Sequence, residues 1–222
     1  MTQQEEGRAA RVRAALELPD ATARLQAAMA AGTRPEPADV EVLVERSAVE
    51  PDFFVRDMLT WALTRHPAEA TVDRLLVELG SVFPQARSQA LHTLSKIGDR
   101  RAYPAITLDL LHDTEDEVAR TAWRAAAALV PEGQEAALAE VLISQLGRGD
   151  RLVHRSLSRA LAALGEASAP VLERAAADPD PDVRAHALAT QQLVRDPDVD
   201  FDDAVAEAQR VVALRGAPLQ DD

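Results

Sequence analysis

Apolar and polar positions along this chain follow a pattern that returns about every 32 residues. Each copy has an aliphatic residue or alanine at an equivalent position, and in four copies an acidic residue stands three positions earlier. The five equivalent residues are spaced by 31, 32, 35 and 30 residues, and they are Val55, Ala86, Val118, Val153 and Val183. A period of this length indicates stacked repeats, each too small to bury its apolar face alone.

Each copy predicts two helices, which we name the A helix and the B helix. Small or apolar residues follow the equivalent position by four residues and, in four copies, by eight, which is the stripe of an amphipathic helix. The predicted A helices span 52–65, 84–97, 115–129, 150–164 and 180–195. The predicted B helices span 68–79, 100–112, 134–146, 167–177 and 201–215. The short connections between them force neighbouring helices to run antiparallel.

Helix ends are marked by residues with known capping behaviour. Asp52, Asp150 and Asp180 are expected to cap A helices, because an Asp carboxylate accepts a hydrogen bond from a free amide of the first turn. Glu115 holds the same place in the third copy and caps less well. Gly98 follows an A helix, where glycine closes a helix in the left-handed conformation.

Composition and organisation favour an all-α protein. Aromatic residues are only 3% of the chain, and no segment alternates β-branched and polar residues. The pattern predicts stacked antiparallel helix pairs, about 12–13 helices in all. Residues 1–50 are predicted to form N-terminal capping helices, at 3–18, 20–31 and 38–49, together with a degenerate repeat. Residues 51–197 are predicted to form four to five repeats, and residues 198–217 a C-terminal capping helix. Residues 218–222 are predicted to be a disordered tail.

Charge and residue usage exclude several classes of function. The chain has no cysteine, which removes disulfides and thiolate chemistry, and its net charge of −13 argues against duplex DNA binding. No stretch approaches the roughly 18 apolar residues of a membrane span. The N-terminus is polar and acidic, so we expect no secretory signal and a cytoplasmic protein.

Two stretches resemble a known repeat family. They are Ile97-Gly-Asp-Arg-Arg-Ala-Tyr-Pro-Ala-Ile106 and Leu164-Gly-Glu-Ala-Ser-Ala-Pro-Val-Leu172. Residues 50–195 resemble the HEAT family, in its short form named after phycobilisome lyases. The resemblance implies a right-handed α-solenoid, an armadillo-type superhelix, with B helices on the concave face and A helices on the convex face. It also implies a structural arginine after the equivalent position, present as Arg56, Arg87 and Arg184 and replaced by Ala119 and His154.

The residues do not match the enzymes known among HEAT-like proteins. Similar di-iron hydroxylases use His-Glu pairs, and none of the five histidines is followed by Glu. Similar DNA glycosylases use a cationic groove and an acid flanked by tryptophans, whereas Trp123 has Ala127 one turn later. Nothing specifies bilin chemistry. The sequence therefore predicts no enzyme, cofactor or metal; the alternative is a HEAT-like enzyme or nucleic-acid-processing protein, glycosylase-like or bilin-lyase-like.

The two helix rows differ in charge. The A helices sum to +3, and the B helices with their entry loops sum to −10. We therefore predict a scaffold that holds a protein or peptide segment, basic in character, on the acidic B-helix face; the other interpretation is an ordinary solvated face. The candidate partner-binding acids are Asp73, Glu78, Asp109, Glu140, Glu173 and Glu207.

The two tryptophans receive different predictions. Trp61 lies in a column that is mostly polar in the other copies, so it is either an exposed partner anchor or a ring packed on the N-terminal helices. Trp123 falls beside Leu91 and Leu188 in the register and is predicted to be core.

Overall fold

A computed structural model of the chain describes residues 3–215, and within them every regular element is a helix. The all-α prediction is confirmed. The predicted tail 218–222 and the end of the 198–217 segment lie outside the described residues. The chain forms two compact units, one up to Thr107 and one from Leu108 onward. The predicted boundaries after residues 50 and 197 stay predictions.

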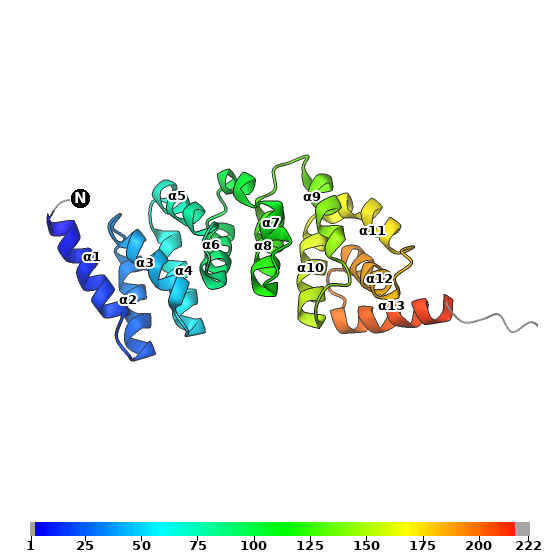
Figure 1. Ribbon diagram of the computed structural model, residues 1–222, viewed down its shortest axis with the longest axis horizontal. Coiled ribbons are helices and arrows are strands. Elements are labelled where there is room, and N and C mark those ends of the chain that lie inside the picture. Colours follow the sequence, from blue (N-terminus) through cyan, green and yellow to red (C-terminus); the bar gives the residue numbers. More distant parts are fainter. Residues whose placement is uncertain (1–2, 216–222) are drawn as a thin grey trace, which may run out of the picture. The chain divides into compact units, whose positions relative to one another are not determined.

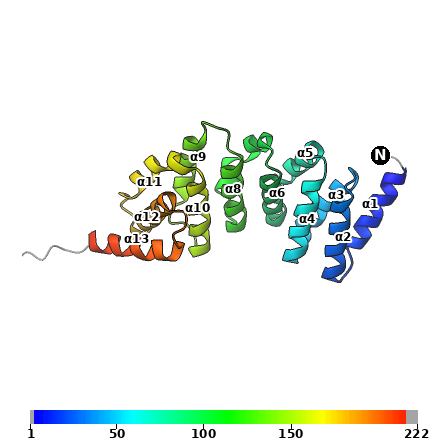
Figure 2. The same cartoon turned by 180° about the vertical axis from the view of Figure 1, so that it is seen from behind.

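Within its described residues, 3–107, the first unit is built of helices (Figure 1). They are α1 (Gln3–Leu16), α2 (Ala21–Thr33), α3 (Asp39–Val49), α4 (Phe53–Arg65), α5 (Ala68–Glu78), α6 (Pro84–Ile97) and the 3-10 helix η1 (Arg100–Ala105). The A helices α4 and α6 lie side by side, and α2 packs along α4 (Figure 2). Fully buried leucines of α1, α3, α4 and α6 form the core of this unit, namely Leu16, Leu43, Leu59, Leu63, Leu91 and Leu94.

The second unit is built in the same way. Its elements are α7 (Leu108–Leu111), α8 (Asp116–Leu129), α9 (Glu135–Leu142), η2 (Ile143–Gln145), α10 (Arg151–Ala163), η3 (Gly165–Ser168), α11 (Ala169–Ala175), α12 (Pro181–Arg195) and α13 (Phe201–Arg215). The A helix α10 packs between α8 and α12. Trp123 is fully buried and donates from Nε1 to the carbonyl of Leu111 at 2.8 Å, which confirms that it is a core residue.

The predicted A helices agree with the observed ones, and so do their ends. Asp52, Asp150 and Asp180 each accept hydrogen bonds from first-turn amides, whereas Glu115 makes no such bond. The difference follows from side-chain length, since the shorter Asp carboxylate reaches the free amides in the capping geometry. Gly98 closes α6 with a φ of 75°, the left-handed conformation.

Three predicted B helices are interrupted. Residues 100–112 form η1 and the short α7, 134–146 form α9 and η2, and 167–177 begin with η3. Pro104 lies inside η1, and because proline has no amide hydrogen it breaks the α-helical hydrogen-bond pattern there. The apolar periodicity marked these segments as helical but did not distinguish a 3-10 turn from an α-helix.

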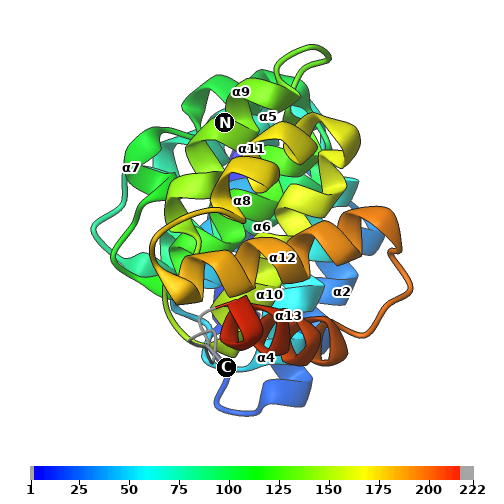
Figure 3. The ribbon, with the colours of Figure 1, turned by 90° about the vertical axis from the view of Figure 1, so that its right-hand side faces the viewer.

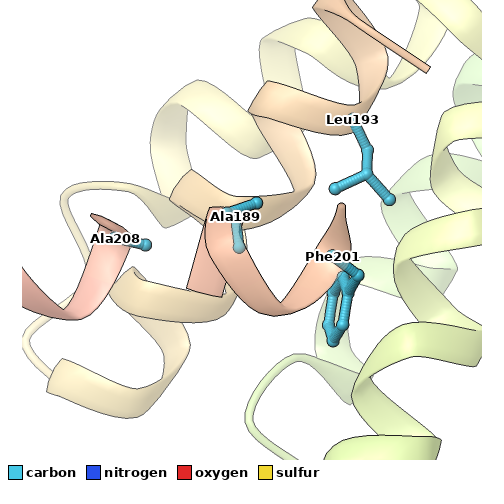
Figure 4. Packing of buried hydrophobic residues seen from close by; sticks show 5 residues of the cluster. Ala189, Leu193, Phe201 and Ala208 are labelled. Atoms are coloured by element: carbon cyan, nitrogen blue, oxygen red, sulfur yellow. The ribbon is translucent and has the colours of Figure 1, made fainter. Parts of the chain in front are cut away.

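The last predicted B helix packs differently from the expectation. Helix α13 does not join the B helix α11, because α12 lies between the two (Figure 3). Its apolar stripe of Phe201, Ala204 and Ala208 packs on Ala189 and Leu193 of α12 (Figure 4). The apolar stripe of α13 is thus buried against the apolar face of α12. This correction also removes Glu207 from the predicted acidic row.

Side chains one period apart contact each other inside each unit. In the first unit Thr60 and Thr93 lie with their hydroxyls 3.4 Å apart, and Arg74 pairs with Glu41 at 2.6 Å. In the second unit Ser158 and Thr190 lie 2.7 Å apart, and Arg174 pairs with Glu140 at 2.6 Å. The sequence separations in these four pairs are 33, 33, 32 and 34 residues. The period seen in the sequence is therefore a spacing between neighbouring helices of one row.

Among residues 3–215, no helix has both the length and the apolar character needed to cross a membrane.

Candidate functional site

Two neighbouring A helices of the second unit, α8 and α10, carry rows of arginines. Arg151, Arg155 and Arg159 follow one another at intervals of four residues on α10, and residues so spaced share one face of a helix. Arg120 and Arg124 do the same on α8, the neighbouring helix.

These two faces border a groove between α8 and α10. The groove encloses about 450 Å3, and we name it the α8–α10 groove. Its walls and floor are formed by Arg120, Arg124, Ala127, Ala128, Leu152, Arg155, Ser156, Arg159, Ala160 and Ala163. Four guanidinium groups thus surround a surface of small apolar side chains. Such a site attracts negative charge at its rim and accepts apolar groups on its floor.

The positive charge of this groove is only partly balanced. Within the described part of the chain, neither Arg124 nor Arg159 has a carboxylate in ion-pair distance. Arg120 reaches Glu117 at 3.4 Å, and its buried Nε atom has no hydrogen-bond partner. Desolvation lowers the pKa of Arg124, and the nearby charge of Arg120 lowers it further, against an opposite influence of Glu117. Among the described residues, the groove therefore offers an anionic ligand two guanidinium groups, those of Arg124 and Arg159, that have no carboxylate partner.

A second groove lies one repeat further along, between α10 and α12. It encloses about 490 Å3, is lined by Arg155, Arg159, Ala162, Ala163, Leu193 and Val194, and is bordered by residues 197–201. Phe201 is 5% exposed, and the Arg155 guanidinium carbon lies 5.6 Å from its ring centroid. Asp202 pairs with Arg151 at 2.7 Å and with Arg155 at 3.2 Å. We name this site the α10–α12 groove; the chain itself covers part of it.

Arg148 links the loop before α10 to α8. Its guanidinium donates to the Asp113 carbonyl, pairs with Asp116 at 2.8 Å and lies 5.9 Å from the Trp123 ring centroid. The arginines of other repeats bond to the loop before their own A helix, as Arg184 does with the carbonyls of Asp178 and Pro179. Since Ala119 cannot make this bond, Arg148 supplies it from the next repeat. The contact also joins the loop that precedes α10 to the start of α8.

A buried polar cluster lies between α10 and α12. The His186 ring, 3% exposed, stacks on His154 with centroids 4.3 Å apart. Its Nδ1 accepts from the Gly147 amide at 3.1 Å, so the proton of the neutral ring is on Nε2, which faces the His154 carbonyl at 3.0 Å. Desolvation, followed by the proximity of His154, lowers the pKa of His186 to about 3. The ring is neutral at physiological pH.

This cluster contains a Ser-His contact without the other parts of a nucleophilic site. Ser158 Oγ lies 3.0 Å from His186 Nε2, but Ser158 is fully buried and also contacts Thr190. A nucleophile needs access to substrate and a third group that orients the base. Here His186 Nδ1 is occupied by a backbone amide. The cluster therefore stabilises the packing of α10 on α12.

The six sequence-predicted acids differ in whether they have partners within the chain. Three of them have partners within the chain: Glu78 with Arg74, Glu140 with Arg174 and Glu207 with Arg210. The other three, Asp73, Asp109 and Glu173, are exposed. Ion pairs at an exposed surface add little stability, but they reduce the net charge that a partner meets.

The Trp61 ring is partly exposed to solvent and partly packed on an N-terminal helix, so it combines the two surroundings that the sequence allowed. It is 40% exposed, and part of its ring packs on Gly32 of α2, where a Cβ atom would lie 2.5 Å from a ring carbon. The ring therefore fills the close approach of α2 to α4 while its other side meets solvent.

The arginines of the α8–α10 groove were not among the predicted site residues. The sequence does contain features that point to a basic site, because the A-helix row carries positive charge and Arg124 and Arg159 occupy equivalent positions. The sequence did not show that α8 and α10 expose these side chains around a common hollow. That requires the packing of the two helices.

Comparisons with known proteins give limited similarity. No protein-family model matches the chain. No curated protein matches it. Among solved structures, an engineered protein of the Northeast Structural Genomics Consortium is 23% identical and covers 94% of this chain and 98% of its own, with a TM-score of 0.46. The complex of CpcE and CpcF of phycocyanin lyase from Nostoc sp. PCC7120 is 18% identical and covers 92% and 94%, with a TM-score of 0.37. At these TM-scores neither similarity assigns an activity.

Proposed function

We propose that this chain is a non-enzymatic scaffold, a HEAT-like α-solenoid, that binds an acidic segment of a partner protein in the α8–α10 groove. The observation that carries the proposal is the pair Arg124 and Arg159, exposed around an alanine floor without carboxylate partners among the described residues. The contacts one period apart support the solenoid, because such contacts arise when each repeat packs on its neighbours.

Two observations describe the polar side chains outside the groove. Within residues 3–215, no three His, Asp or Glu side chains come together in a way that could hold a metal ion. The Ser158–His186 contact is enclosed in the core. A HEAT-like enzyme remains the alternative, and its test is activity on a defined substrate.

The acidic B-helix face stays a second prediction. A basic segment there would have to compete with Arg74 and Arg174, which already bind Glu78 and Glu140. The α8–α10 groove has no such internal competitor at Arg124 or Arg159 within the described chain. This difference favours an acidic partner over a basic one.

A direct binding measurement tests the proposal. A fluorescein-labelled helical peptide rich in Glu and Ala is titrated with the full chain, and its anisotropy is read at low and at high salt. We expect saturable binding that weakens with salt, because exposed charges are screened within about 10 Å at 0.1 M. The variant R124E/R159E should weaken binding about tenfold or more.

The matched control is R65E/R195E, which makes the same change in charge at two exposed arginines outside the groove. Equal loss of binding in both double variants would show that only net charge matters and would refute the groove. A Lys-rich peptide that binds more tightly than the acidic one would move the site to the B-helix face.

A further inference from the structure

The chain carries a partly filled equivalent of the α8–α10 groove. Arg120 and Arg155 are equivalent positions of successive A helices, as are Arg124 and Arg159, and Ala127 and Ala162. The α8–α10 groove and the α10–α12 groove therefore repeat the same arrangement, with arginines on the first A helix and small residues beside them. The residues that occupy the α10–α12 groove therefore indicate which chemical groups the α8–α10 groove can accept.

The occupant of the α10–α12 groove is the start of α13. Phe201 belongs to the cluster with Leu193 against which Ala162 packs, and the Arg155 guanidinium lies over its ring. The next residue, Asp202, places its carboxylate on Arg151 and Arg155. The amide of Asp202 donates to the Asp200 side chain at 2.8 Å, so Asp200 caps this helix. An Asp-Phe-Asp sequence at a helix start thus combines a cap, an aromatic anchor and an ion pair.

The α8–α10 groove presents the corresponding surface without an occupant from the described chain. Arg120 stands where Arg155 stands in the filled groove, and its Nε atom is buried without a hydrogen-bond partner. Ala127 takes the place of Ala162. One position differs, because the equivalent of Arg151 is Asp116, which is held by Arg148. An incoming carboxylate would therefore be received by Arg120 and by Arg124 or Arg159.

We propose that the partner segment is the first turn of a helix in which an aromatic residue is followed by Asp, as in Asp200-Phe201-Asp202. This inference rests on the proposed function and names its ligand. The aromatic ring lies on Ala127 and Ala163 beneath Arg120, where the guanidinium contacts its face, and the carboxylate pairs with the rim arginines. Charge complementarity selects the segment, and the aromatic ring fixes its position.

The probe is a fluorescein-labelled peptide with the sequence of residues 197–212, added to the full chain. Three peptides are compared: the native one, one with Phe201→Ala, and one with Asp202→Asn. We expect the native peptide to bind, the Phe201→Ala change to weaken binding by more than about tenfold, and the Asp202→Asn change to weaken it by less, because exposed ion pairs contribute little. The protein variant R120A/R124A should abolish binding, since these residues line only the α8–α10 groove.

Two controls locate the peptide. R195A removes an exposed arginine of α12 outside both grooves and should bind normally. Alanine methyl NMR should show shifts at Ala127 and Ala128, which line the α8–α10 groove and not the α10–α12 groove, on addition of the native peptide. Unchanged far-UV circular dichroism of R120A/R124A confirms that the variant is folded.

The outcomes separate the two proposals. If the Phe201→Ala peptide binds as tightly as the native one, the aromatic anchor is wrong while an acidic ligand still stands. If no acidic peptide binds, the proposed function is wrong as well. Tighter binding of a duplex oligonucleotide than of any peptide, lost in R120A/R124A, would overturn both in favour of nucleic acid.

Discussion

The imidazole of His186 stacks on that of His154, 32 residues earlier, and accepts the amide hydrogen of Gly147. Gly147 has a φ of 79°, and a Cβ atom there would lie 3.2 Å from a methyl carbon of Val183. One buried ring thus joins α10, α12 and the loop before α10. The arrangement holds only while His186 is neutral, since a protonated ring would present a hydrogen to the Gly147 amide.

Acidification should therefore destabilise the second unit. The pKa of His186 falls from an ordinary value of 6.5 to about 3 on folding. Below the ordinary value the unfolded chain binds a proton that the folded chain does not, so stability falls as pH decreases from 6.5 toward 3. Near pH 5 this amounts to about 2 kcal/mol relative to neutral pH.

The measurement is urea unfolding at neutral pH and near pH 5, followed by Trp123 fluorescence in a Trp61→Phe background. His186→Gln should be less stable at neutral pH but lose less on acidification. An identical pH dependence in His186→Gln and its parent would show that His186 is not the titrating group.

Protonation of Glu50 should destabilise the first unit, at a lower pH than that at which the second unit is destabilised through His186. Its carboxylate is fully buried and accepts from Arg24, Arg46 and the Asp52 amide. Burial raises its pKa, but the hydrogen bonds from Arg24, the Asp52 amide and Arg46 together outweigh burial and lower the pKa to about 2. The stability it contributes is present above the ordinary value of 4.5 and is lost as pH falls toward 2.

Glu50→Gln should lower the free energy of unfolding by about 3–5 kcal/mol, because it leaves the buried Arg24 guanidinium without its counter-charge. Trp61 fluorescence reports this unit. Glu69→Gln, a change at an exposed carboxylate, is the control and should alter stability by less than about 0.5 kcal/mol.

Gly32 is expected to tolerate no side chain. A Cβ atom there would lie 2.5 Å from the Trp61 ring and 2.8 Å from the Ala62 Cα atom. Gly32→Ala should destabilise the first unit by about 1–3 kcal/mol, measured by thermal unfolding. Trp61→Ala should relieve only part of this loss, because the Ala62 backbone still contacts the new methyl group.

Gly80→Ala is the matched control for that experiment, since the nearest atom to its Cβ position is 3.7 Å away. Equal effects of the two glycine substitutions would show that α2 and α4 do not approach each other as described.

Docking of α13 should depend on its aromatic residue far more than on its ion pairs. Phe201 is 5% exposed in the cluster with Leu193, and Phe201→Ala should destabilise this docking by about 3–5 kcal/mol. Asp202→Asn removes partly exposed ion pairs to Arg151 and Arg155, which contribute about 0.2–1 kcal/mol each.

Amide hydrogen exchange distinguishes these cases. Residues 201–215 should lose protection in Phe201→Ala and keep most of it in Asp202→Asn. Full protection in Phe201→Ala would mean that other contacts hold α13.

Several local features could be read correctly before any packing was known. The equivalent positions from Val55 to Val183 predicted the A helices, because a helical stripe is set by the spacing of residues along one segment. The Asp caps followed from chemistry within a few residues, and so did the weaker capping by Glu115. Pro104 is visible in the sequence as a residue that interrupts an α-helix, but the apolar periodicity led to a prediction of one continuous helix over 100–112.

The candidate site required contacts between distant residues. Arg120 and Arg155 lie on different helices, and only the packing of α8 on α10 brings them to one groove. The acidic B-helix face was predicted from a sum of charges, and the structure shows that Arg74 pairs with Glu78 and Arg174 with Glu140. A sum of charges along a row does not include such pairing.

By itself, the sequence determined the all-α class, the repeat period, the A helices with their caps, and the burial of Trp123. These depend on interactions within one helix or on a pattern repeated in register. Only the tertiary structure decided that α13 packs on α12 instead of extending the B helices, and that arginines 35 residues apart share a groove. An apolar stripe in the sequence shows that a helix face must be buried, but not which helix will cover it. The effect of a charged side chain depends on its distance in space from other groups, and the packing of the helices sets that distance.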